Sequence, residues 1–160
     1  MILAFLDAHQ FADGSVRGTI LCTDERTRPL EFRVTEPIAP DHLQQLLFGA
    51  VLDEHLLGDL CGVPLLSALR EQPDYVLVRD QALLSLQAVR DESILWVGRD
   101  EAAEDSGVVL GNHGDGDGEV LQRARRDLRA VAEHYDLLEP FDRMTAAVAH
   151  VHSQGIGVGA

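Results

Sequence analysis

One histidine and two aspartates alternate with glycine in the segment 111–119, GNHGDGDGE, with the spacing that opens a calcium-binding loop. His113, Asp115 and Asp117 stand at every second position, where such loops place their first ligands. The loop also requires a bidentate glutamate at its twelfth position, and that position, counted from His113, is Ala124. We therefore predict a turn-rich loop here and no calcium site.

The other local signatures of catalysis fail on spacing or on context. Glycines at 155–160, GIGVGA, are arranged as in a dinucleotide-binding turn but lack the following helix that would hold a pyrophosphate. The histidines form no H-E-x-x-H pair, and the sequence has no G-x-S-x-G nucleophile elbow. All 13 basic residues are arginine, whereas a Walker A loop or a Schiff-base enzyme needs a lysine. These classes of enzyme are therefore excluded.

Acidic residues outnumber basic ones by 27 to 13, which gives a net charge of -14. Such a surface repels nucleic acid backbones and anionic membranes, so neither is an expected partner. It suits the acidic partner of a basic protein, and it equally suits an acidic coat that reflects a GC-rich genome or high salt. The sequence has no membrane-spanning run and no signal peptide, and Cys22 and Cys61 lack disulfide or metal spacing. We expect a cytoplasmic protein without structural disulfides.

The elements that would position any site begin with strands. Met1–Ala8 is apolar on both faces, which predicts a central strand. Ser15–Glu36 alternates as an antiparallel hairpin, and its turn, Asp24–Pro29, is rich in residues that bond their own backbone or fix φ. The residues expected on one side of the second hairpin strand are Leu30, Phe32 and Val34. The first 36 residues therefore predict a three-stranded meander.

After Pro37 the apolar period changes to that of helices. A first helix is predicted from Pro40, with Gly58 or Gly62 as its end, and a shorter one from Pro64 to a stop near Pro73. The residues expected on the core side are Leu43, Leu46, Leu47, Ala50 and Val51 in the first helix, and Leu65, Leu66 and Leu69 in the second.

A buried strand is predicted at Asp74–Asp80, DYVLVRD, parallel to the first strand. Residues 81–89 fit a short helix or a strand equally well. A further strand at 93–98, an acidic loop at 99–106 and a short edge strand at 108–110 follow. Two helices are then expected, from Val120 and from Pro140 to Val151, and a flexible tail at 153–160. Their expected inward residues are Leu121, Ala124, Leu128, Val131, Tyr135 and Leu138, then Phe141, Met144, Val148 and Val151.

The helix from Val120 carries the one basic cluster, Arg123, Arg125, Arg126 and Arg129. Arginines so grouped either bind phosphates or carboxylates in a bidentate manner, or pair with acidic neighbours on the same helix. Arg123, Arg126 and Arg129 are the candidates for an interaction.

Acidic residues stand at the ends of several predicted elements. Asp7 closes the first strand, Asp53 and Glu54 lie on the helix after the meander, and Asp80 closes the next strand. This order of carboxylates and the element order β-β-β-α-β-α, over Met1–Asp80, resemble the ribonuclease-H-like superfamily. Asp7 and Asp80 equally fit residues that end strands and cap turns.

The resemblance implies two divalent ions, Mg²⁺ or Mn²⁺, about 4 Å apart, one activating water and the other stabilising the leaving oxygen of a phosphodiester. Asp7, Glu54 and Asp80 would then be both metal ligands and catalytic residues. Asp59 could take the helical position, and Asp127 or Asp142 the fourth position.

The predicted fold is a single α/β domain over residues 1–152, with a mixed sheet that starts as an antiparallel meander. Residues 74–80 and 93–98 extend the sheet, and helices at 40–72 and 120–151 cover it. We expect a small acidic accessory or protein-interaction domain, without catalytic activity or cofactor, that binds a protein partner or self-associates. The alternative is a divalent-metal-dependent nuclease or phosphodiesterase of the ribonuclease-H-like type.

Overall fold

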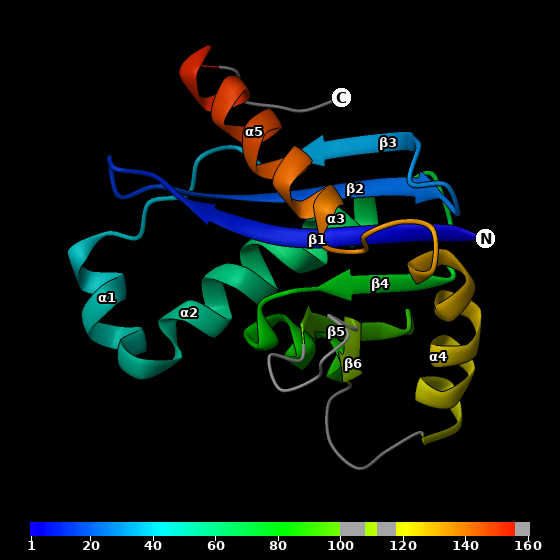
Figure 1. Cartoon of the computed structure of the whole chain (residues 1–160). Coiled ribbons are helices and arrows are strands. Elements are labelled where there is room, and N and C mark those ends of the chain that lie inside the picture. Colours follow the sequence, from blue (N-terminus) through cyan, green and yellow to red (C-terminus); the bar gives the residue numbers. More distant parts are fainter. Residues whose placement is uncertain (100–107, 112–117, 156–160) are drawn as a thin grey trace.

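A six-stranded mixed sheet forms the centre of the structure, a computed structural model that describes residues 1–99, 108–111 and 118–155. The strand order is β3-β2-β1-β4-β5-β6 (Figure 1). The strands are β1 (Ile2–Gln10), β2 (Val16–Asp24), β3 (Pro29–Val34), β4 (Tyr75–Val78), β5 (Ile94–Arg99) and β6 (Val108–Gly111). β1, β4 and β5 run parallel, while β2 and β6 are antiparallel to their neighbours β1 and β5. The predicted mixed α/β fold is confirmed, and so are the meander and the parallel strand that follows it.

The turn between β2 and β3 is organised by one carboxylate. Asp24 accepts hydrogen bonds from the backbone N–H groups of Arg26 and Arg28, both at 2.9 Å, and from Arg28 Nε at 2.7 Å. Thr27 adopts a φ of 58° at the tip of the turn. The predicted hairpin therefore forms because its polar turn satisfies its own backbone.

Both faces of the sheet are covered, because successive side chains of a strand point to opposite sides. Leu3 and Phe5 of β1 pack in one core cluster with α4 (Gly118–Ala132) and α5 (Glu139–Ser153). Ala4 and Leu6 pack in a second cluster on the other face. Figure 1 shows α5 crossing the sheet in front of β1 and β2. β1 is thus the central strand that its two apolar faces predicted.

The second face is covered by the later part of a continuous helical run between β3 and β4, and by a 3₁₀ helix between β4 and β5. The run comprises α1 (His42–Phe48), the 3₁₀ turn η1 (Gly49–Val51), α2 (Leu52–Glu54), the π-helix η2 (His55–Gly62) and α3 (Val63–Ala68). Residues 81–89 fit a helix or a strand from the sequence, and the structure has a second 3₁₀ helix there, η3 (Gln81–Ala88). Leu65 and Leu66 of α3 and Leu83 of η3 are buried as the second core cluster requires.

The predicted end of the first helix at Gly58 or Gly62 is wrong, since the helical run continues through both residues. At Gly62 a Cβ atom would lie 2.5 Å from Leu86 Cδ1, so this glycine allows η2 to approach η3 closely. The chain bends at Gly49 instead, whose φ of +49° lies in the region that favours glycine.

The predicted core side of the first helix is also wrong. Leu43, Leu46, Leu47 and Val51 are 62%, 67%, 74% and 57% exposed, and no residue of α1 is buried. We name these four side chains the α1 face. Figure 1 shows α1 away from the sheet, beyond α2. The apolar stripe was read correctly, but the bend at Gly49 leaves it without a partner in the described chain.

Six of the ten residues predicted to face inward on the later helices are buried, whereas Leu121, Leu138 and Val151 are partly buried and Tyr135 is exposed. Ala124, Leu128, Val131, Phe141, Met144 and Val148 are buried. Tyr135 is 37% exposed, because α4 ends at Ala132 before the apolar spacing does. Residues 100–107, 112–117 and 156–160, and with them most of the acidic loop, the calcium-like segment and the tail, lie outside the described residues. No helix of the described chain is long and apolar enough to cross a membrane.

Candidate functional site

Asp7 is the most buried charged group among the acidic candidates. It lies on β1 on the same face as Leu3 and Phe5, and its residue surface is 4% exposed. The parallel register pairs Leu6 with Val78, so the residue that comes beside Asp7 at the end of β4 is Arg79 and not Asp80. In the observed β1–β4 register Arg79 lies beside Asp7, and a shift by one residue would place Asp80 there instead.

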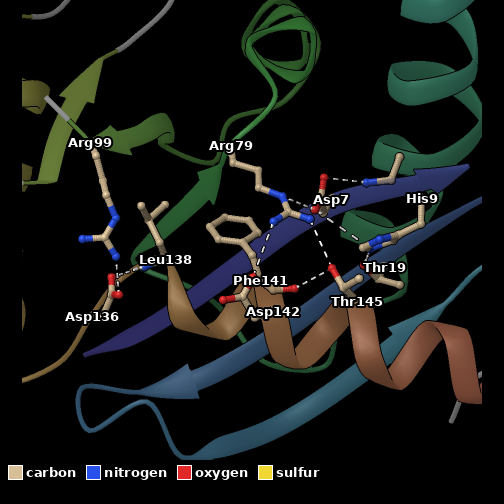
Figure 2. A network of polar contacts seen from close by, with 11 residues as sticks. Asp7, His9, Thr19, Arg79, Arg99, Asp136, Leu138, Phe141, Asp142 and Thr145 are labelled. Atoms are coloured by element: carbon tan, nitrogen blue, oxygen red, sulfur yellow. Dashed lines mark hydrogen bonds and ion pairs between the residues drawn. The ribbon is translucent and has the colours of Figure 1, made fainter. Parts of the chain in front are cut away.

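Arg79 ties Asp7 to helix α5 (Figure 2). Its Nε donates to Asp7 Oδ2 at 2.6 Å, and its Nη2 donates to Thr145 Oγ1 at 3.2 Å. The guanidinium carbon lies 5.3 Å from the ring centroid of Phe141, and Nη1 is 4.0 Å from Asp142 Oδ1. The other oxygen of Asp7 accepts the backbone N–H of Ala8 at 2.9 Å. This network joins β1, β4 and α5.

His9 extends the network along β1. Its Nε2 lies 2.9 Å from Thr19 Oγ1 on β2 and 4.0 Å from Asp7 Oδ2. Because one nitrogen faces both groups, the imidazole does not bridge the carboxylate and the hydroxyl as a catalytic triad requires. Thr19 is fully buried, so a substrate cannot reach its hydroxyl.

Burial dominates the titration of this pair. It raises the pKa of the Asp7 carboxyl above its ordinary value of 3.8, against the opposing effects of Arg79 and His9. Burial likewise lowers the pKa of the His9 imidazole below its ordinary value of 6.5, against the attraction of Asp7. Burial thus opposes the charged form of each group, while Arg79 opposes that effect at Asp7.

Glu54 and Asp80 lie elsewhere. Glu54, on α2, lines a cavity with Ser85 and Leu86, and Leu86 belongs to the core cluster on the sheet face opposite Asp7. Asp80 is exposed and caps η3, where its carboxylate accepts the N–H of Ala82 at 2.9 Å. The structure therefore does not bring the three predicted ligands together.

Of the other acids considered from the sequence, Asp142 shares Arg79 with Asp7, whereas Asp127 and Asp59 have partners of their own. Asp127 accepts the hydroxyl of Tyr75 at 2.6 Å, and Asp59 lies 2.9 Å from His55 Nδ1. Within the described residues, no three His, Cys, Asp or Glu side chains are placed to hold one metal ion. This arrangement does not fit the metal pair that the resemblance implies.

The arginines of α4 are exposed on the helix surface. Arg123 and Arg126 line a polar cavity of about 370 Å³ together with Glu119 and Gln122. Arg125 donates to the carbonyl of Leu110 at 3.3 Å, which fixes α4 to β6. Arg129 lies in the last turn of α4, where a positive charge is favourable to the helix dipole. The predicted interaction role of Arg123, Arg126 and Arg129 stays a prediction.

A larger cavity lies beside the α1 face and was missed from the sequence. Its volume is about 410 Å³, and its lining includes Phe48, Val51, Glu54, Leu86 and Val89. The only sequence signal for this surface is the apolar spacing of the first helix, which the sequence alone predicts to face the core. Only the bend in the chain shows that this stripe faces outward.

The fold and its polar network define an α/β domain with a mixed sheet and a structural ion pair at its centre. No protein-family model matches the chain, and no curated protein matches it by sequence. The structure is similar to the crystal structure of LC11-RNase H1 in complex with RNA/DNA hybrid, with 18% identity and a TM-score of 0.30. The match covers 57% of this chain and 64% of that chain. Similarity at this level defines neither a family nor an activity.

Proposed function

We propose that the chain is a non-catalytic acidic protein-interaction domain that binds through the α1 face. The observation that supports this proposal is the exposure of Leu43, Leu46, Leu47 and Val51, each by more than half. Exposed apolar residues that are scattered singly need no explanation, whereas three leucines on one helix with Val51 just beyond it form a group typical of an interaction surface.

Covering the α1 face would supply enough free energy to matter. Full burial of one aliphatic side chain contributes about 1.5–3 kcal/mol, so covering the exposed part of these four contributes about 4–8 kcal/mol. Association costs about 4–15 kcal/mol in lost rigid-body freedom, so neighbouring contacts must add to this. The cavity beside Val51 and the exposed Val89 provide room for such contacts.

The polar network argues for a scaffold and against a catalytic centre. Asp7 is itself buried and is held by Arg79 and by the N–H of Ala8, so both of its oxygens are engaged by the fold, while the Arg79 side chain is 39% exposed. For a metal-dependent nuclease, Mn²⁺ should raise the melting temperature, and Asp7→Asn should abolish that rise. We expect no rise in either protein.

The interaction proposal is tested by affinity capture from native lysate on immobilised protein, followed by purification of each captured protein and direct titration. Leu46→Ala/Leu47→Ala is compared with the wild type and with Leu30→Ala, which truncates a leucine that is 48% exposed on β3. We expect a captured protein that binds the wild type and Leu30→Ala equally and the double variant at least about tenfold more weakly. If no captured protein distinguishes the double variant from Leu30→Ala, the proposal is wrong.

A further inference from the structure

The cavity next to the α1 face has an apolar floor and an acidic rim. Leu86 and Val89 of the η3 region and Phe48 and Val51 of the helical run supply apolar walls, and Val89 is 66% exposed. The rings of Phe48 and His55 stack at 4.2 Å, with an interplanar angle of 14°. This stacked pair holds the end of α1 against η2. Val51 belongs to the α1 face and also lines the cavity, so the two adjoin at this residue.

The charged residues that the helical run contributes to this surface are all acidic. The chain has no arginine or lysine between Arg33 and Arg70, a stretch that includes the whole of α1, α2 and η2. The acidic residues in this stretch are Glu36, Asp41, Asp53, Glu54 and Asp59. Glu54 and Asp59 line the cavity itself. Arg90, which follows Val89 on the opposite wall, is paired with Glu92. A cationic ligand is thus attracted to the acidic side of this surface.

We infer that the α1 face and its cavity bind a cationic amphipathic α-helix of another protein. The inference rests on the proposed function and adds the chemistry of the partner. An amphipathic helix places apolar side chains at steps of three and four, which match an apolar stripe with the same spacing on α1. Lysines or arginines beside the partner's stripe then meet Glu54 and Asp59 at the rim.

A second copy of this chain is the occupant that the charges oppose. Each copy has a net charge of -14, and a symmetric dimer through this surface would place Glu54 and Asp59 of one copy near the same residues of the other. Like charges facing each other destabilise an interface. The surface therefore favours a basic partner over self-association.

The experiment uses fluorescein-labelled peptides about five helical turns long and measures fluorescence anisotropy with the full chain. The probes are an amphipathic leucine–lysine helix, a scrambled peptide of the same composition, and an amphipathic leucine–glutamate helix. We expect the amphipathic leucine–lysine peptide to bind at least about tenfold more tightly than the other two. Leu46→Ala/Leu47→Ala should weaken this binding at least about tenfold, and Leu30→Ala should leave it unchanged.

A second pair of variants tests the acidic rim. Glu54→Gln/Asp59→Asn should weaken the amphipathic leucine–lysine peptide and reduce the dependence of its affinity on salt. The matched control is Glu119→Gln/Glu133→Gln, which removes the same charge from exposed positions on and after α4. Because charges further apart than about 8 Å are screened at physiological salt, the control should have a smaller effect.

Each contrary result identifies what failed. Equal binding of the scrambled and amphipathic leucine–lysine peptides, or equal effects of the two charge pairs, would overturn the inference in favour of general charge attraction. A dimer in light scattering that Leu46→Ala/Leu47→Ala dissolves would overturn it in favour of a second copy. If the lysate test succeeds while the peptides are not distinguished, the interaction function stands and the partner chemistry is wrong. If no lysate protein depends on Leu46 and Leu47, the interaction function itself is wrong.

Discussion

The exposure of two adjacent leucines on α1 can be tested against two adjacent leucines in the core. Leu46 and Leu47 are 67% and 74% exposed, so the chain covers about one-third of the first and one-quarter of the second. Since full burial contributes about 1.5–3 kcal/mol per side chain, Leu46→Ala/Leu47→Ala should lower the free energy of unfolding by about 1–2 kcal/mol or less. Alanine preserves helix propensity, so no further loss is expected from the backbone.

Leu65 and Leu66 provide the matched comparison, because both are 4% exposed in the second core cluster. Leu65→Ala or Leu66→Ala alone should lower the free energy of unfolding by about 2–5 kcal/mol, through lost burial and the cavity left behind. Urea denaturation followed by circular dichroism measures both changes, with the slope of the transition as a check on two-state behaviour.

The outcome decides whether the α1 face is free in the isolated chain. If Leu46→Ala/Leu47→Ala destabilises the fold by more than about 4 kcal/mol, the two leucines pack as a core pair does. The orientation that the apolar spacing first predicted would then be correct. The docking surface, and the proposals that depend on it, would be refuted.

Three further predictions concern the core and its buried acid. Because burial raises the pKa of the Asp7 carboxyl, the native state keeps this proton to higher pH than the unfolded state does. The contribution of Asp7 to stability is therefore largest below its ordinary pKa of 3.8, and it falls as pH rises through the raised pKa. Unfolding free energies measured across this range should show that fall in the wild type relative to Asp7→Asn, and parallel curves would contradict it. Gly62→Ala should destabilise the fold by about 1–3 kcal/mol, because the added methyl group would contact Leu86. Gly58→Ala should be tolerated, because the nearest atom to its added methyl group would be 3.8 Å away. Equal effects of the two variants in urea denaturation would refute the close approach of η2 to η3. Phe141→Ala should lower the free energy of unfolding by about 3–5 kcal/mol because its ring is fully buried edge-on to Phe5, and a loss below about 1 kcal/mol would contradict that packing.

The sheet could be predicted because its local signals agree with its long-range pairing. Leu3 and Ala4 are apolar neighbours that point to opposite faces, and both are fully buried, so the run itself identified a central strand. The Asp24 carboxylate bonds the backbone of its own turn, which needs no distant residue. Signals of this kind are contained within a few residues of the chain.

The site could not be predicted because it depends on the register between β1 and β4 and on which way the apolar side of the first helix faces. Asp7 and Asp80 follow adjacent parallel strands, but the register pairs Asp7 with Arg79 and leaves Asp80 to cap η3. Likewise, the spacing of Leu43 and Leu47 identifies an apolar side of a helix without specifying what that side faces. The bend at Gly49 decides the direction, and no periodicity records it.

α1 packs only lightly against the rest of the chain, so an interface formed by α1 should be able to open locally. No residue of α1 is buried, and its start is held by a capping box in which Asp41 and Gln44 satisfy each other's backbone N–H groups. Opening these roughly two turns of helix would break few apolar contacts, so the amides of α1 should exchange with solvent far sooner than those of β1. In the proposed interface, α1 is therefore expected to unfold and refold locally while the sheet stays intact.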